Sequence, residues 1–149
     1  LLAKNPTLHI IRIFPIKKNE ADIWQGFIQV DSESMEQYCQ TKTTFTKQDI
    51  ALGKNLWEAY QNGDFTKLKV LSQSETHCFE YLGEICQAHI DRYPIDHTVG
   101  RPEKILLDIM ATHTLQFEEV FSKFSRRAGI YGFGDLQVKG MYNRLLGKK

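Results

Sequence analysis

The chain has 149 residues, of which 42% are hydrophobic, 25% charged and 11% aromatic. These proportions are those of an ordinary globular protein, and they argue against a wholly disordered, collagen-like or coiled-coil chain. Nineteen Lys and Arg residues nearly balance eighteen Asp and Glu residues, so the formal net charge is +1. A charge so close to zero argues against a protein that binds nucleic acid or a membrane surface along its whole length.

The first thirty residues are predicted to hold two short strands. Residues 8–14 are a β-branched apolar run that ends at Pro15, and residues 23–30 are a second run in which Gly26 marks a bulge. We expect the two runs either to pair as a hairpin or to join strands that precede Leu1. The chain begins without an initiator methionine, so we expect a fragment whose upstream part is missing.

From residue 32 onward the apolar spacing is typical of amphipathic helices. Thr46 and Asp49 resemble a capping box that opens a helix over residues 47–61. The apolar stripe of this helix is predicted to consist of Ile50, Gly53, Trp57 and Tyr60.

Two more helices are expected before the middle of the chain ends. Asp64 is placed to cap a short helix, and Ser74 to cap a longer one over residues 75–92. Pro94 ends the longer helix, because its ring disfavours helical backbone at the preceding residue.

Residues 94–100 form the best candidate for a linker, between an N-terminal part of residues 1–93 and a C-terminal part of residues 101–149. Three helices are predicted in the C-terminal part, beginning near Pro102, Thr114 and Asp135. The predicted fold class is therefore mainly α. It is a helical bundle with a small N-terminal β element and a C-terminal three-helix unit of winged-helix-like outline.

Basic residues gather in these last helices. Residues 101–149 hold nine Lys and Arg against five Asp and Glu, whereas residues 1–100 hold ten against thirteen. The side chains that we expect to contact nucleic acid, if the unit binds it, are Lys139, Asn143, Arg144, Lys148 and Lys149. Against this, the connection over residues 127–134 is longer than a helix-turn-helix turn, and we expect no hairpin wing after Lys149. The glycines of that connection predict a turn with Tyr131 and Phe133 in the core, not a nucleotide site.

The three cysteines do not predict a metal site or a cofactor. Cys78 and Cys86 fall on one predicted helix at a separation too great for a disulfide, which favours a reducing, cytoplasmic compartment. Cys86 and His89 stand at i, i+3, and His77 precedes them by more than two turns, but close Cys–Cys or His–His ligand pairs are missing. We therefore predict buried thiols that act as small apolar side chains, and a histidine hydrogen-bonded in or near the core.

Catalytic motifs are also missing from the sequence: there is no Gly-x-Ser-x-Gly elbow, His-Glu-x-x-His pair or Walker loop. No catalytic residue is therefore nominated. If the chain is an accessory part of an enzyme, we expect a pocket at the junction of its two parts that contains His89, Arg92 and Arg101.

Several short sequence motifs follow one another in a characteristic order. They are Asp49-Ile50-Ala51-Leu52-Gly53, Leu56-Trp57 with Tyr60, Phe79 with Tyr81-Leu82, Ala88-His89, Arg92-Tyr93-Pro94, Gly100-Arg101-Pro102-Glu103 and Ile130-Tyr131-Gly132-Phe133-Gly134-Asp135. They resemble the C-terminal half of an uncharacterised bacterial family, domain-of-unknown-function family 1835. The resemblance covers nearly the whole chain and implies a bacterial, cytosolic protein with a helical tail. It brings no activity and no catalytic residue.

The leading functional prediction is a non-enzymatic regulatory or protein-interaction module, whose partner is another protein or the missing N-terminal region. One alternative is a nucleic-acid-binding, winged-helix-like domain. The other is an accessory domain of an enzyme whose active site lies upstream. No apolar run is long enough for a membrane span, so no membrane partner is expected.

Overall fold

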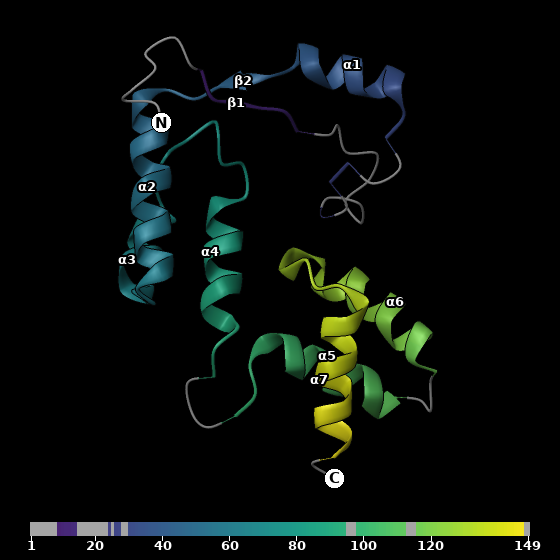
Figure 1. Cartoon of the computed structure of the whole chain (residues 1–149). Helices are drawn as coiled ribbons and strands as arrows, with labels where there is room; N and C mark the ends of the chain where they lie inside the picture. Colours follow the sequence, from purple (N-terminus) through teal and green to yellow (C-terminus); the bar gives the residue numbers. More distant parts are fainter. Residues whose placement is uncertain are drawn as a thin grey trace. The chain divides into compact units, whose positions relative to one another are not determined.

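The computed structural model describes residues 9–14, 24, 26–27, 30–94, 98–112 and 116–147. These residues are mainly helical, with a small two-stranded sheet near the N-terminus, so the predicted fold class is confirmed (Figure 1). The chain forms two compact units, Leu1–Gly83 and Glu84–Lys149, called here the N-terminal and C-terminal compact units. None of the described helices is both long and apolar enough to cross a membrane.

The sheet of the N-terminal compact unit pairs β1 (Ile11–Arg12) with β2 (Thr43–Thr44). The strands are antiparallel, with Ile11 opposite Thr44 and Arg12 opposite Thr43. Phe45 continues the ladder by donating its N–H to the carbonyl of Ile10 at 2.9 Å. The partner of the first predicted strand is thus not the second predicted run but residues 43–44, where no strand was predicted.

The described part of the second predicted strand, residues 23–30, is not a strand. Trp24 lies in a 3-10 turn, and Gly26 and Phe27 form a turn. Gly26 has φ of +60°, a left-handed conformation that glycine adopts readily in a turn. The expected bulge is therefore a turn, and the remaining residues of this run lie outside the described residues.

Local capping defines the first three helices. Asp31 caps α1 (Ser32–Gln40) by accepting the N–H of Ser34 at 2.7 Å. The helix α2 (Lys47–Gln61) has the predicted bounds and the predicted capping box. Asp64 caps α3 (Phe65–Leu71) through the N–H of Lys67 at 2.8 Å, as expected.

The apolar stripe predicted for α2 is only partly right. Trp57 and Tyr60 are 57% and 47% exposed, and their rings stack on each other with centroids 5.5 Å apart. The buried residues of this helix are Asp49 and Ala59. The buried face is therefore rotated away from the two large aromatic side chains.

The helix α4 (Leu82–Asp91) begins seven residues later than predicted. Ser74 donates its N–H to Leu71 and ends the turn after α3 instead of opening a helix. Thr76 donates its hydroxyl to Asp49 at 3.1 Å and accepts the N–H of Cys78 at 3.1 Å. These bonds hold the segment against α2, so Cys78 lies in a loop and not on the helix that carries Cys86.

The C-terminal compact unit contains the three predicted helices, α5 (Arg101–Thr112), α6 (Phe117–Ala128) and α7 (Asp135–Leu146). Helix α5 contacts both α6 and α7. Apolar side chains from all three helices form one buried cluster: Leu106, Ile109, Val120, Phe124, Ala128, Val138, Met141 and Leu145.

The connection between α6 and α7 packs as predicted. A short 3-10 turn, η3 (Gly129–Tyr131), precedes Gly132. Gly132 has a positive φ of +61°. Tyr131 and Phe133 pack against the core.

Two helix starts differ from the prediction. Gln116 stands at the N-cap of α6, and Thr114 lies outside the described residues. Gly134 stands at the N-cap of α7, so Asp135 is the first residue of that helix and not its cap.

Candidate functional sites

A pocket of about 360 Å³ lies in the C-terminal compact unit, between the first turn of α5, one face of α7 and Arg92, which follows α4. Its polar side chains are Arg92, Glu103, Gln137 and Arg144. Its apolar wall consists of Pro102, Phe133, Leu136 and Met141, together with the backbone at Gly140.

Helix α7 supplies one wall because of its spacing. Leu136, Gly140 and Arg144 recur every four residues and therefore lie on one face of the helix. A Cβ atom at Gly140 would lie 3.9 Å from an Arg144 guanidinium nitrogen, so the missing side chain leaves room beside that group.

Arg144 is positioned by the first turn of α5. One oxygen of Glu103 accepts the N–H of Gly100 at 3.1 Å, which caps this helix. Its other oxygen lies 3.5 Å from Nη2 of Arg144. The Arg144 side chain is 62% exposed, and a guanidinium carries five donors. Most of these donors therefore remain available to an anionic ligand.

Arg92 supplies the second cation. Its guanidinium lies over the ring of Phe133, 4.9 Å from the centroid, and among the described residues it makes no ion pair. A cation that stacks on an aromatic face keeps its edge directed to solvent.

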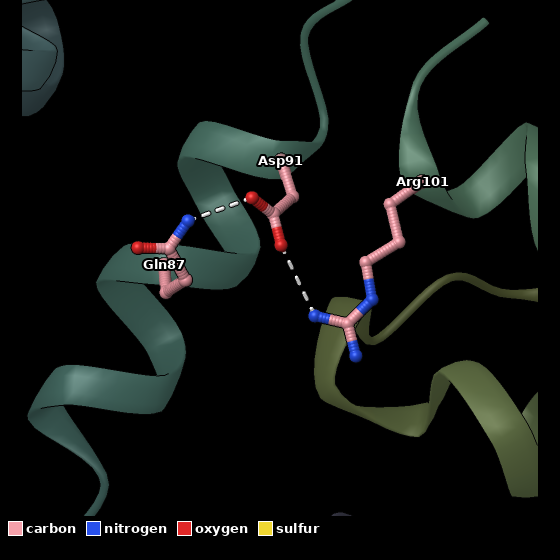
Figure 2. A network of polar contacts seen from close by, with 3 residues as sticks. All are labelled: Gln87, Asp91 and Arg101. Atoms are coloured by element: carbon pink, nitrogen blue, oxygen red, sulfur yellow. Dashed lines mark hydrogen bonds and ion pairs between the residues drawn. The ribbon is translucent and has the colours of Figure 1, made fainter.

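Contacts of Asp91 and the close approach of Gly100 fix the backbone at Arg92. Asp91 accepts from Nε2 of Gln87 at 2.7 Å and from Nη1 of Arg101 at 3.2 Å, which joins the end of α4 to the start of α5 (Figure 2). A methyl group at Gly100 would collide with the carbonyl oxygen of Arg92. The close approach of these two backbones therefore requires glycine.

The three residues of the expected junction pocket have different surroundings. Arg92 lines the pocket, whereas Arg101 pairs with Asp91. His89 packs edge-on against Tyr93 with ring centroids 5.4 Å apart. Burial, with the charge of Arg92, lowers the pKa of His89 below its usual value, which favours the neutral imidazole.

Three of the candidate nucleic-acid contacts, Lys139, Asn143 and Arg144, lie on α7. The amine of Lys139 lies 5.5 Å from the centroid of Phe117, and Asn143 is exposed. Arg144 lines the pocket, and Lys148 and Lys149 lie outside the described residues.

Sequence reasoning missed most of the pocket wall. The spacing of α7 could have placed its members on one face, but the pairing of Arg144 with Glu103 joins residues on different helices. No local pattern indicates such a contact.

A second group of chemically active side chains lies in the N-terminal compact unit. The ligand atoms of Asp49, His77 and Cys78 all lie within 4.8 Å of one another. Asp49 and Cys78 are 5% and 1% exposed, and His77 is exposed. Sequence reasoning weighed cysteines and histidines as metal ligands but assigned Asp49, which is 28 residues away from His77 along the chain, only to a capping box.

Asp49 is held by an extensive hydrogen-bond network. Its Oδ2 accepts the N–H of Thr46 at 2.8 Å and the hydroxyl of Thr46 at 2.6 Å, and its Oδ1 accepts the hydroxyl of Thr76 at 3.1 Å. These bonds to the charged form lower the pKa of Asp49 from 3.8 to about 2. Burial and the nearby carboxylate raise the pKa of Cys78, and burial raises that of Cys86, so both thiols stay protonated. Both cysteines are buried, as predicted.

Comparison with protein-family models, with curated protein sequences and with solved structures found no match to this chain. The resemblance to family 1835 therefore stays a prediction, and no function comes to this chain from another protein.

Proposed function

We propose that the C-terminal compact unit is a non-enzymatic protein-interaction module whose pocket binds a carboxylate on an acidic, partly apolar segment of a partner protein. The observation that carries the proposal is the placement of Arg92 and Arg144 in one pocket beside an apolar wall. This deepens the leading prediction from the sequence by assigning the module a site and a ligand chemistry.

The chemistry of the pocket favours a carboxylate. The planar guanidinium fork matches the two oxygens of a carboxylate in a bidentate arrangement. Leu136, which is 78% exposed, and Phe133 offer apolar contact for a neighbouring side chain of the ligand. Glu103 limits the negative charge that the pocket tolerates, which favours a singly charged carboxylate over a doubly charged phosphate.

Binding of labelled peptides to the full chain tests the proposal. The probe is a capped peptide of alternating Leu and Glu, and its control has Gln in place of every Glu. Fluorescence polarisation measures the binding. We expect saturable binding of the acidic peptide and at least tenfold weaker binding of the Gln peptide. Equal binding of the two peptides would contradict the proposal.

Variants locate the binding site. Arg92→Gln and Arg144→Gln should each weaken binding about tenfold, because a charged hydrogen bond at a partly exposed site is lost. Arg126→Gln removes the same charge from an exposed position on α6 and should leave binding unchanged. Losses of equal size in all three variants would indicate attraction by net charge alone and would refute the pocket.

The nucleic-acid alternative has support of its own in the basic balance of residues 101–149 and in exposed Lys139 and Asn143. A short DNA duplex is therefore titrated in parallel at several salt concentrations. Phosphate contacts require binding that weakens as salt rises. Duplex binding that is lost in Lys139→Gln and kept in Arg92→Gln would replace the carboxylate proposal by this alternative.

A further inference from the structure

We propose that Asp49, His77 and Cys78 form a zinc-binding site in the N-terminal compact unit, with one coordination position left for water or an external ligand. The three residues supply one oxygen, one nitrogen and one sulfur ligand, and zinc accepts all three types. The site is independent of the carboxylate pocket, which lies in the other compact unit.

The distances between the ligand atoms suit a small metal ion. All three atoms lie within 4.8 Å of one another. Zinc–ligand bonds of about 2.0–2.3 Å in a tetrahedron place neighbouring ligand atoms about 3.3–3.8 Å apart. Closing the site therefore requires a movement of about 1 Å, which His77, the exposed member of the group, can make by side-chain rotation.

The contacts around Asp49 resemble those of a metal-bound carboxylate. Ligating carboxylates are usually hydrogen-bonded by surrounding groups that fix their orientation. Thr46 and Thr76 hold the Asp49 side chain in this way, at 2.6 Å and 3.1 Å. A carboxylate has about four lone-pair positions, and the bonds from the two threonines use three of them.

The thiol of Cys78 lies where its proton can be exchanged for a metal ion. It lies 3.9 Å from the carbonyl oxygen of Thr44 and within hydrogen-bonding reach of Asp49. When Zn²⁺ binds, the Sγ–H bond breaks, a zinc–sulfur bond forms and the proton passes to solvent. The thiolate and the carboxylate then balance the two positive charges of the ion, and the neutral imidazole of His77 adds none.

Metal titration of the reduced full chain tests the site. We expect one zinc ion to bind per chain, with the release of one proton. Cobalt should give a thiolate-to-cobalt charge-transfer band, because Co²⁺ occupies such sites and reports their sulfur ligand. A cobalt complex without this band would overturn the proposal.

Three variants assign the ligands. His77→Gln changes an exposed side chain and should weaken zinc binding at least tenfold without unfolding the chain. Cys78→Ala should abolish the charge-transfer band. Cys39→Ser removes the exposed cysteine of α1 and is the control, expected to change neither measurement.

Two outcomes would refute the assignment even if zinc binds. The first is unchanged affinity in His77→Gln, which keeps the test valid if Cys78→Ala fails to fold. The second is loss of the cobalt band in Cys39→Ser, which would show adventitious binding at a surface thiol.

Discussion

Asp49 joins three segments of the N-terminal compact unit. It completes the capping box of α2 with Thr46, holds the loop at Thr76 and lies beside the thiol of Cys78. Each of these contacts favours the carboxylate over the carboxylic acid. The ionisation of one side chain therefore contributes to the stability of the whole compact unit.

The stability of this unit should accordingly depend on acid pH. Because the pKa of Asp49 is about 2 in the folded state and about 3.8 in the unfolded state, the unfolded chain binds more protons in the interval between them. The stabilisation by Asp49 is complete above this interval and is lost as the pH falls through it. We expect Asp49→Asn to remove this part of the acid dependence. The measurement is urea unfolding at several pH values in the presence of a chelator. Tryptophan fluorescence monitors the unfolding, because both tryptophans, Trp24 and Trp57, belong to the N-terminal compact unit.

Glu36→Gln is the control for this experiment, because it removes an exposed carboxylate from α1. An acid dependence that is the same in Asp49→Asn and in the unaltered chain would contradict the assignment.

Gly100 is the second position where one residue determines the local structure. A methyl group there would meet the carbonyl oxygen of Arg92, and backbone atoms cannot move aside as a flexible side chain can. We expect Gly100→Ala to destabilise the C-terminal compact unit by about 1–3 kcal/mol, the usual cost of overpacking. Gly134→Ala is the matched control, because a Cβ atom at Gly134 meets nothing within 4 Å. Hydrogen exchange of the α5 amides measures the effect, and equal protection in both variants would contradict it.

At the scale of the elements, α5, α6 and α7 each contact the other two, and α5 contributes Leu106 to their shared core. Leu106 of this helix is 0% exposed, so Leu106→Ala should cost about 2–5 kcal/mol through lost burial and the cavity that remains. Leu136→Ala removes the same atoms from a side chain that is 78% exposed and should cost less than about 0.5 kcal/mol. Urea unfolding, monitored by NMR signals of α5–α7, measures the free energy of unfolding of both variants. Similar losses of stability in the two variants would show that the helices do not pack as described.

The elements also show which features the sequence could predict. Helix α2 was predicted at both ends because its signals, Thr46 with Asp49 and the turn after Gln61, lie within a few residues of the backbone that they satisfy. The predicted start of α4 was wrong because the hydrogen bond from Thr76 to Asp49, 27 residues away, prevails over the local capping signal at Ser74.

The small β element was predicted, but the partner of its first strand and the grouping of residues in the two candidate sites were not, for the same reason. Pairing of Ile11 with Thr44 brings together residues far apart in the sequence, and neither residue indicates the other. The ion pair between Glu103 and Arg144 and the approach of His77 to Asp49 are likewise tertiary contacts. Helical periodicity can place a residue on one face of its helix, but it does not indicate which element packs against that face.

At the scale of the whole molecule, the three cysteines report on different parts of the chain. Cys39 is exposed on α1, whereas Cys78 and Cys86 are buried, the first in the N-terminal and the second in the C-terminal compact unit. A buried, protonated thiol reacts with an electrophile only when its surroundings open. Thiol labelling therefore reports the opening of the structure around each buried cysteine separately.

In the metal-free chain, we expect Cys39 to be labelled rapidly and Cys78 and Cys86 slowly. Mass spectrometry identifies the labelled sites. Cys86 of α4 is buried but is not among the described members of the core cluster that contains Leu106, so its labelling reports opening around α4 and not opening of that cluster. Rapid labelling of Cys78 or of Cys86 in the unaltered chain would contradict the burial of that side chain.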